Sequence, residues 1–187
     1  MAKKFKKKLI GKRIVLKYNP PLISTATAIF KVIDANRKHL APWFPWEKTT
    51  KKVEDSFIYL LGVEKEFKNG KKVDYGIYLN NEYIGNIGIF DIDPEKRSAE
   101  IGYWLCSKFT RQGYVSEAVK LIEKEFFLNH NLNRIQIKCD EINKASAGVA
   151  MKCGYKLEGK IREDAYEKSR KKFRNTLLFS KLKSEYK

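Results

Sequence analysis

The segment FTRQGYVSEAV (residues 109–119) combines residue types that suit the binding of an anion. It follows AEIGYWLC (residues 99–106), which reads as a strand, and its second half has a helical pattern. The first N–H groups of a helix have no intrahelical partners, and the helix dipole places partial positive charge beside them. Gly113 lets the backbone approach a ligand closely, while Arg111 and Gln112 can add donors. The sequence therefore predicts a candidate phosphate site at this turn.

A second segment, NKASAGVAMKCGYKLEG (residues 143–159), favours that interpretation. Asn143 has the residue type and position of a helix N-cap, and Ser146 follows it by three residues. The Asn143 amide either caps this short helix and does nothing else, or it also reaches a ligand at the mouth of a sheet. The first segment has a plain alternative as well, because Ser116 and Glu117 suit ordinary helix initiation.

Four segments in this order resemble the GNAT N-acetyltransferase superfamily: AEIGYWL, FTRQGYVSEAV, LNRIQIKCDEINKAS and KCGYKLEG. Nearer the N-terminus, HLAPWFPW resembles the Rim-type branch, the ribosomal-protein N-terminal alanine or serine acetyltransferases. The resemblance covers nearly the whole chain and is much less specific for the substrate than for the superfamily. It implies an α/β GNAT fold, a mixed, mostly antiparallel twisted sheet of about seven strands flanked by about four helices.

The resemblance also implies acetyl-CoA as the cosubstrate, with no metal. Backbone N–H groups of the strand ending in Trp104, Leu105 and Cys106 would polarise the acetyl carbonyl and stabilise the oxyanion. Asn143 would contact the pantetheine arm, and Ser146 would protonate the departing CoA thiolate. The residues that would cradle the pyrophosphate are Arg111, Gln112, Gly113, Tyr114, Val115 and Ser116.

This chain departs from the family pattern Q/R-x-x-G-x-G/A at Thr110 and Val115. A valine at position 115 narrows the close approach that glycine or alanine permits, although backbone N–H donation is independent of the side chain. We therefore expect a phosphate-binding turn that keeps its backbone donors but departs from the family motif at two positions.

The general base is the third departure, because the acidic residue of the Rim-type branch aligns with Ala165. Strand alternation would send Glu163, and not Asp164, to the same face as Ala165. Glu100 shares a face with Trp104 on the central strand and is our first choice for removing a proton from the amine. The alternative for Glu100 is a salt bridge at the start of a strand.

The loop HLAPWFPWEKT (residues 39–49) carries Trp43, Phe44 and Trp46 and is broken by two prolines. These aromatic side chains either form a wall for an acceptor peptide or plug the hydrophobic core.

The elements that must position these residues follow from periodicity and turn signals. The pattern predicts the order β-α-α-β-β-β-α-β-α-β-β, with a hairpin that turns at Asn80-Asn81. The expected strands are 13–18, 74–80, 82–92, 99–106, 133–141, 155–164 and 173–183. The expected helices are 20–40, with prolines in its first turn, 51–70, 113–130 and 143–154.

The length and composition fit one globular domain over residues 1–187, with 43% hydrophobic and 13% aromatic residues. Cys106, Cys139 and Cys153 are too widely spaced for a CxxC-type metal site, so we expect reduced thiols in a cytoplasmic protein. The basic N-terminus is followed by no long apolar stretch, which argues against a secretory signal. No apolar run approaches the ~18 residues of a membrane helix, so we expect a soluble protein.

The charge is strongly basic, with 39 Lys and Arg against 22 Asp and Glu and a net charge of +17. Either a polyanion such as ribosomal RNA lies nearby, or the lysines form a solvated surface. The clusters KKFKKK (residues 3–8) and EKSRKKFR (residues 167–174) keep the first interpretation open.

Together these features predict an acyltransferase, an acetyl-CoA-dependent N-acetyltransferase in which the amine attacks the thioester directly. The preferred acceptor is the N-terminal α-amine of a protein, including a ribosomal protein. The alternatives are a small-amine or polyamine acetyltransferase, a catalytically weak acyl-CoA-binding module, and an RNA-associated protein that uses its basic termini. A monomer and a homodimer both stay open.

Overall fold

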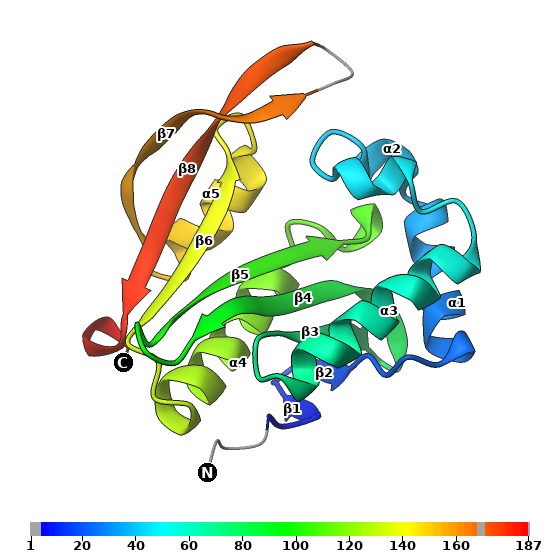
Figure 1. Ribbon diagram of the computed structural model, residues 1–187, viewed down its shortest axis with the longest axis horizontal. Coiled ribbons are helices and arrows are strands. Elements are labelled where there is room, and N and C mark those ends of the chain that lie inside the picture. The colour runs from blue at the N-terminus through cyan, green and yellow to red at the C-terminus, as the bar shows by residue number, and fades with distance from the viewer. Residues whose placement is uncertain (1–4, 168–170, 187) are drawn as a thin grey trace.

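A computed structural model of the chain describes residues 5–167 and 171–186 (Figure 1). These residues contain an eight-stranded sheet in the order β1-β2-β3-β4-β5-β6-β8-β7. β5 and β6 pair in parallel, and the other neighbours pair antiparallel. The strands are β1 (Lys8–Ile10), β2 (Ile14–Tyr18), β3 (Val73–Leu79), β4 (Glu82–Asp93), β5 (Ser98–Leu105), β6 (Arg134–Asp140), β7 (Lys156–Glu167) and β8 (Lys172–Leu182).

Two groups of helices cover the two faces of the sheet (Figure 1). The first group is α1 (Ile23–Asp34), α2 (Arg37–Leu40) and α3 (Val53–Lys68), and the second is α4 (Tyr114–Asn129) and α5 (Lys144–Lys152). Side chains of β5 alternate between the two layers, because Ile101 and Leu105 pack in the core cluster with α4, whereas Trp104 packs in the cluster with α1 and α3.

The predicted α/β class, with a mixed and mostly antiparallel sheet, is confirmed, and the sheet has one strand more than expected. The additional strand is β1, which pairs antiparallel with β2 and buries Leu9 opposite Leu16. Three residues at the end of a lysine run offer no alternating pattern, so the sequence gives no signal for this strand. The prediction that the chain forms a single domain stays a prediction.

The helix predicted over residues 20–40 is wrong in two respects. The prolines precede α1, which begins at Ile23, and the helical run breaks before α2. The break lies at buried Asn36, whose Nδ2 donates to the carbonyl of Val32 at 2.8 Å. Its Oδ1 accepts from the N–H of Ser107 at 2.9 Å. This side chain therefore replaces helical hydrogen bonds with a contact to a distant loop.

The predicted hairpin turn is confirmed, because Asn80 and Asn81 connect β3 to β4 with φ of 48° and 67°. Two left-handed residues are the signature of a type I′ turn, which suits the twist of a hairpin. The strand and the helix predicted on either side of residues 107–112 are found as β5 and α4. A short 3₁₀ helix, η2 (Ser107–Phe109), and a turn come before α4.

None of the helices in the described ranges combines the length and the apolarity that crossing a membrane requires.

Candidate active site

A gap opens in the middle of the sheet between β5 and β6. The two strands pair over three positions, beginning at Ser98 and Arg134, and then diverge (Figure 1). The N–H of Cys106 donates to a carbonyl of β4 at 2.8 Å. Because backbone groups alternate in direction along a strand, the N–H groups of Tyr103 and Leu105 point the other way, toward the gap. The gap is therefore bordered by a strand edge that β6 does not pair.

The N-terminus of α4 is a turn with two left-handed residues, Arg111 with φ of 61° and Gly113 with φ of 83°. The first intrahelical bond runs from the N–H of Glu117 to the carbonyl of Gly113, at 3.0 Å, and no side chain caps the helix. The N–H groups that have no intrahelical acceptor are those of Gly113, Tyr114, Val115 and Ser116. Such a set of donors suits an oxyanion.

Two cations that the sequence analysis missed flank this turn. A Cβ on Gly113 would lie 3.4 Å from Arg13 Nη2 and 3.9 Å from Lys152 Nζ. Arg13 is held by Glu117, with Nε 2.9 Å from Oε2, and its guanidinium lies 4.6 Å from the ring centroid of Tyr114. Although burial alone would raise it, hydrogen bonds from Arg13 hold the pKa of Glu117 below its usual value. The turn thus fits a diphosphate, with free donors, two cations and no side chain in the way.

The N-terminus of α5 carries the second predicted cluster. Asn143 is the cap, as predicted, because its Oδ1 accepts from the N–H of Ser146 at 3.1 Å. The Ser146 hydroxyl lies 3.0 Å from the hydroxyl of Tyr103, which also donates to the Ser146 carbonyl at 3.1 Å. Burial raises the pKa of Tyr103, so the phenol keeps its proton and can donate. Tyr103 on β5 therefore joins Ser146 across the gap, a contact that the sequence pattern did not indicate.

The other predicted cofactor residues lie around the same gap and turn. Leu105 is buried, and Cys106 and Trp104 are half-buried at the end of β5. Val115 is half-buried against the core and Ser116 is buried, whereas Gln112 is exposed and its carbonyl accepts from Arg13 at 2.9 Å. Cys106, Cys139 and Cys153 are all free thiols.

Glu100 lies at the end of the gap where β5 and β6 still pair. Its Oε2 accepts from Gln136 Nε2 at 3.1 Å and forms an ion pair with Lys138 Nζ at 3.0 Å. Its neighbour across the strands is Phe90 on β4. This geometry fits the salt-bridge alternative, and the role of Glu100 as a base stays a prediction.

The alternation argument for Glu163 does not apply, because β7 bulges between Ile161 and Ala165. Glu163 has φ of 54°, and its N–H donates to Asn175 Oδ1 at 2.9 Å. Glu163 and Asp164 are both exposed. A bulge is set by the partner strand, and a single-strand pattern cannot reveal it.

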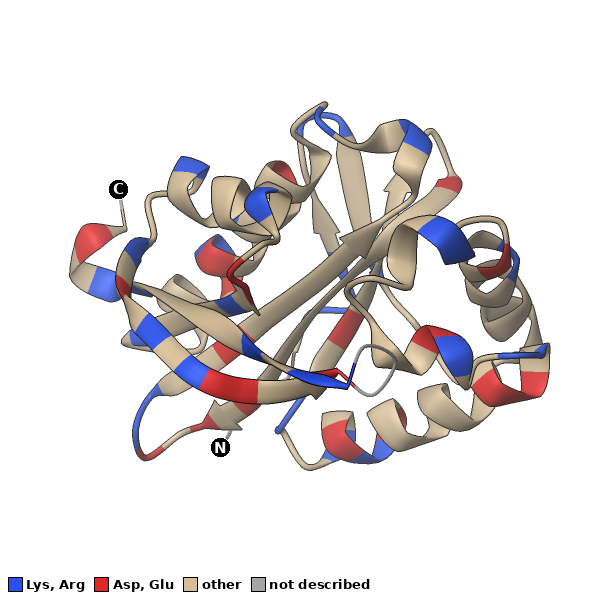
Figure 2. Cartoon of the chain, turned by 90° about the horizontal axis from the view of Figure 1, so that it is seen from above, with Lys and Arg blue, Asp and Glu red and all other residues tan. Residues whose placement is uncertain are grey.

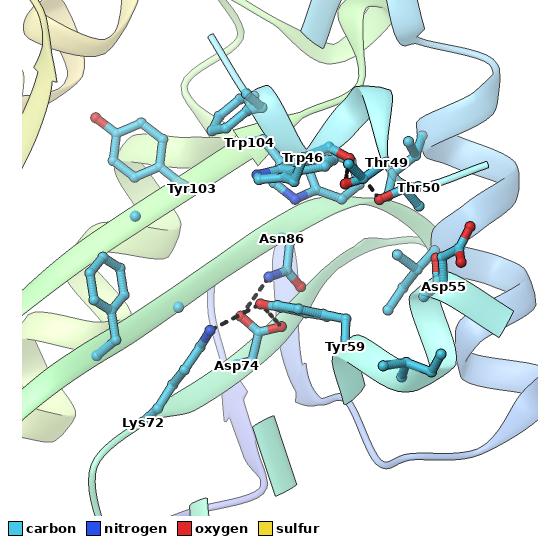
Figure 3. A pocket seen from close by; sticks show the side chains of 18 of the residues that line it. Trp46, Thr49, Thr50, Asp55, Tyr59, Lys72, Asp74, Asn86, Tyr103 and Trp104 are labelled. Carbon is cyan, nitrogen blue, oxygen red and sulfur yellow. Dashed lines mark hydrogen bonds between the residues drawn. The ribbon is translucent and has the colours of Figure 1, made fainter. Parts of the chain in front are cut away.

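A cavity of about 560 Å³ lies between β3–β5 and the layer of α1 and α3 (Figure 3). Phe44 and Trp46 line it and also pack against the core cluster of α1 and α3, so the core-plug alternative holds for them, and their role as a wall for an acceptor stays a prediction. Trp43 is half-buried and does not line the cavity. The aromatic side chains of the lining are Phe44, Trp46, Tyr59, Tyr83, Phe90, Tyr103 and Trp104.

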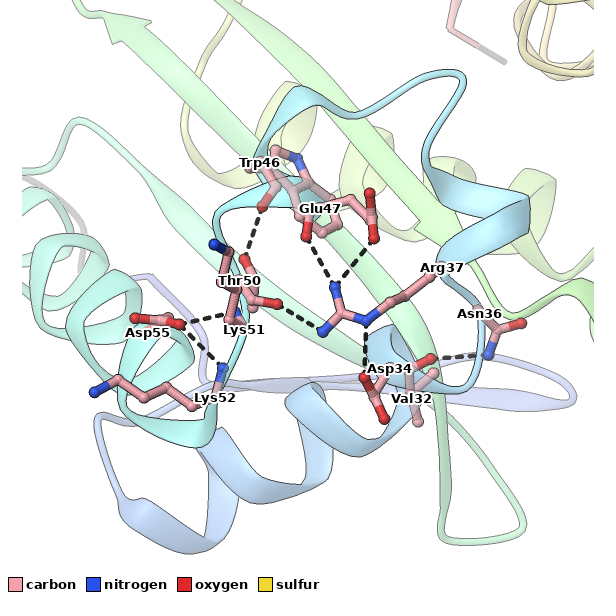
Figure 4. A network of polar contacts seen from close by, with 10 residues as sticks. All are labelled: Val32, Asp34, Asn36, Arg37, Trp46, Glu47, Thr50, Lys51, Lys52 and Asp55. Carbon is pink, nitrogen blue, oxygen red and sulfur yellow. Dashed lines mark hydrogen bonds and ion pairs between the residues drawn. The ribbon is translucent and has the colours of Figure 1, made fainter.

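A polar network fixes the loop that carries Phe44 and Trp46 (Figure 4). Arg37 forms ion pairs with Asp34 at 2.8 Å and with Glu47 at 3.0 Å, and it donates to the carbonyl of Thr50 at 2.8 Å. One guanidinium thus ties the end of α1 to the C-terminal half of the short 3₁₀ helix η1 (Pro45–Lys48) and to the residues that follow it. The cavity wall is consequently held in one position.

The floor of the cavity carries a carboxylate that the sequence analysis missed. Asp74 on β3 is 2% exposed and pairs with Gly88 on β4, which in turn pairs with Gly102 on β5. A Cβ on Gly88 would lie 2.9 Å from Asp74 Oδ1, so the carboxylate leans over this glycine. The sequence does show an aspartate inside the apolar strand VDYGIYL, which could have marked it as unusual. The glycines that face it can be identified only when the pairing of β3, β4 and β5 is known.

Lys and Arg are spread over helices, strands and loops, interleaved with acidic residues (Figure 2). The clusters at residues 3–8 and 167–174 lie partly outside the described residues. In the described part of the chain, no group of three or more His, Cys, Asp or Glu side chains could hold a metal ion.

Several known proteins are similar to this chain in sequence or in fold. The profile of a family described as "Acetyltransferase (GNAT) domain" matches residues 16–156. The ribosomal-protein-serine acetyltransferase of Escherichia coli (strain K12) is 29% identical over 144 residues, which is 74% of this chain and 80% of that protein. The fold is similar to that of the microcin C7 self-immunity acetyltransferase MccE in complex with acetyl-CoA and AMP, with a TM-score of 0.84, 25% identity and coverage of 91% of this chain and 93% of that chain. It is also similar to that of Mycobacterium smegmatis RimJ in complex with CoA-disulfide, with a TM-score of 0.89, 24% identity and coverage of 99% and 91%.

Proposed function

We propose that this chain, which belongs to the GNAT acetyltransferase family, transfers acetyl from acetyl-CoA to the N-terminal α-amine of a protein, with a ribosomal protein as the favoured acceptor. The relationship to a ribosomal-protein-serine acetyltransferase over most of both chains supports this acceptor. The observation that carries the proposal is that the unpaired edge of β5 and the free N-terminus of α4 border one gap. A ribosomal acceptor would place the protein in the cytoplasm.

The free N–H groups of α4, with Arg13 and Lys152, bind the pyrophosphate in this proposal. The N–H groups of Tyr103 and Leu105 donate to the acetyl carbonyl oxygen as it gains negative charge. Acetyl-CoA, when bound, supplies the thioester. Ser146, with Tyr103 as its partner at 3.0 Å, returns a proton to the sulfur.

The acceptor occupies the cavity on the other face of β5, against Phe44 and Trp46. Trp104 lines this cavity, and Leu105, the next residue, has its N–H directed at the gap, so the two substrates approach the same segment of β5 and meet at its unpaired edge. A second candidate acceptor is a small amine. The concave cavity of about 560 Å³, with aromatic side chains in its lining, favours it, because such a site can bury most of a small ligand.

The test is an acceptor screen with acetyl-CoA, in which release of the CoA thiol and the mass of the product are both measured. The panel holds peptides with a free N-terminal serine or alanine, the same peptides with a blocked N-terminus and an internal lysine, and a set of small amines and polyamines. Acetylation of the free α-amine alone is expected. Acetylation of small amines alone would favour the second candidate. Binding of CoA without acetylation of any amine would overturn both in favour of an acyl-CoA-binding module.

A further inference from the structure

Asp74 is a buried carboxylate that has no direct cationic partner. Among residues 5–167 and 171–186, no Lys or Arg nitrogen forms an ion pair with it, and its partners are neutral. Asn86 Nδ2 donates to Oδ1 at 2.7 Å, and the Tyr59 hydroxyl donates to Oδ2 at 3.3 Å (Figure 3). Lys72 reaches it indirectly, with Nζ 3.2 Å from the Tyr59 hydroxyl. Buried charges are normally paired, so this carboxylate is short of one cation.

The network around Asp74 prepares an ionised carboxylate. Asn19 Nδ2 donates to Asn86 Oδ1 at 2.7 Å, which turns the Asn86 amide so that its Nδ2 faces Asp74. An ionised carboxylate has room for about four hydrogen bonds, and the two described here leave some of that capacity open to the cavity. Burial raises the pKa of Asp74, against the opposing effect of Lys72. A raised pKa brings a carboxylate closer to the range in which it accepts a proton efficiently near neutral pH.

The strand neighbours of Asp74 on the way to the gap are two glycines, and the ring of Phe90 leans over the second of them, Gly102. Gly88 and Gly102 lie in line with it on the next two strands, and both line the cavity. Neighbouring strands lie about 4.8 Å apart, and Asp74 Oδ1 already leans over Gly88. An amine nitrogen over the Gly88–Gly102 pair, at the edge of the Phe90 ring, would therefore lie about 5 Å from the carboxylate, which is the span of one bridging water.

We propose that Asp74 receives the ammonium group of the acceptor in this cavity and, through one water, takes the proton that must leave before attack. This inference rests on the proposed acetyl transfer and assigns its missing base. Glu100 is a weaker choice because Lys138 and Gln136 already occupy its carboxylate and because it does not line the cavity.

The protons balance as follows. The acceptor arrives as an ammonium ion, and one of its protons passes to Asp74. The freed lone pair forms the new N–C bond, the C–S bond breaks, and its electron pair leaves on the sulfur. The nitrogen then loses a second proton while the sulfur gains one, and Asp74 returns its own proton to solvent.

The test compares Asp74→Asn with the wild type on the best acceptor from the screen, across pH 6.5 to 9. At pH 6.5 we expect a loss of about 100-fold in kcat/KM for the amine, the low end of what a general base contributes. An α-amine has a pKa of about 8, so at pH 9 it is mostly neutral without help, and the loss should shrink below about tenfold. The other titratable groups that face Asp74 are Lys72, Tyr59, Tyr83 and Tyr18, and a Lys72→Met profile identifies any contribution from the lysine.

Glu82→Gln is the matched control, because this exposed carboxylate lies on the same sheet, pairs with Lys108 and does not line the cavity. Gly88→Ala provides a second variant, since its methyl would lie 2.9 Å from Asp74 Oδ1 and must displace the carboxylate. We expect it to reproduce the pH-dependent loss with CoA affinity retained. An Asp74→Asn rate equal to the wild type, or a loss that is the same at every pH, would overturn the role of Asp74. A wild type that acetylates no amine would instead overturn the proposed function.

Discussion

Replacing Gly113 by alanine separates the phosphate cradle from an ordinary helix start. Gly113 has φ of 83°, a conformation that costs other residues about 1–2 kcal/mol. The reduced entropy of the unfolded chain offsets about 0.4–1 kcal/mol of this. We therefore expect a net loss of about 1 kcal/mol of unfolding free energy, or about 2–4 °C in Tm for a chain of this size.

The effect on CoA should be larger than the effect on stability. The new methyl would lie 3.4 Å from Arg13 Nη2 and 3.9 Å from Lys152 Nζ, in the space where a phosphate oxygen would lie. Loss of one hydrogen bond to a charged group removes about 1.5–3 kcal/mol. This corresponds to a loss of at least about tenfold in CoA affinity, measured by calorimetry beside a thermal melt.

Two glycines provide the controls. Gly70 has φ of 70° and open space around its Cβ position at the end of α3, so Gly70→Ala carries the same backbone strain away from the cradle. Gly62 lies inside α3 with nothing within 4 Å, so Gly62→Ala should stabilise the protein by about 0.5–1 kcal/mol. Unchanged CoA affinity in Gly113→Ala, or an equal loss of affinity in Gly70→Ala, would refute the cradle.

Three further outcomes are expected. Ser146→Ala should lower kcat at least about tenfold with CoA affinity nearly kept, and an unchanged rate would remove Ser146 from the mechanism. Arg37→Lys should lower the free energy of unfolding in urea by about 1–2 kcal/mol, because a lysine ammonium cannot replace the several hydrogen bonds of the guanidinium, among them the ion pair with Glu47. It should also raise KM for the amine more than KM for acetyl-CoA. Equal changes in the two KM values would contradict this. Lys181→Met should cost about 3–5 kcal/mol at pH 8, because it leaves buried Glu123 without its ion partner at 3.0 Å. Burial raises the pKa of Glu123, and loss of Lys181 would raise it further, so the variant's carboxyl takes up a proton more readily and the loss should shrink toward pH 5; a loss independent of pH would count against this pairing.

The features that the sequence predicted well depend on patterns within one short segment of the chain. The buried face of α4, with Ala118, Val119, Ile122 and Phe126, repeats at helical spacing, and Asn80-Asn81 marks its own turn. The cap at Asn143 is equally local. These predictions needed no knowledge of the elements that pack against the segment.

The residues that the sequence did not reveal depend on long-range register. Arg13 precedes β2 and reaches the α4 turn through Glu117 and the carbonyl of Gln112, two contacts that only the fold brings together. Tyr103 meets Ser146 across a gap that exists because two parallel strands diverge. Asp74 lies in line with two glycines, one on each of the next two strands, and this alignment depends on how the three strands pair. Pairing register is set by the whole sheet, so a pattern within one strand cannot give it.

The two proposed substrate regions approach β5 from opposite faces of the sheet. The aromatic cavity opens in the layer of α1 and α3, whereas the α4 turn lies in the other layer, so neither substrate needs the entrance of the other. Product inhibition should follow this arrangement. CoA should compete with acetyl-CoA and be noncompetitive toward the amine, and the acetylated product should leave without waiting for CoA. The approach of the two substrates from opposite faces thus favours random-order turnover.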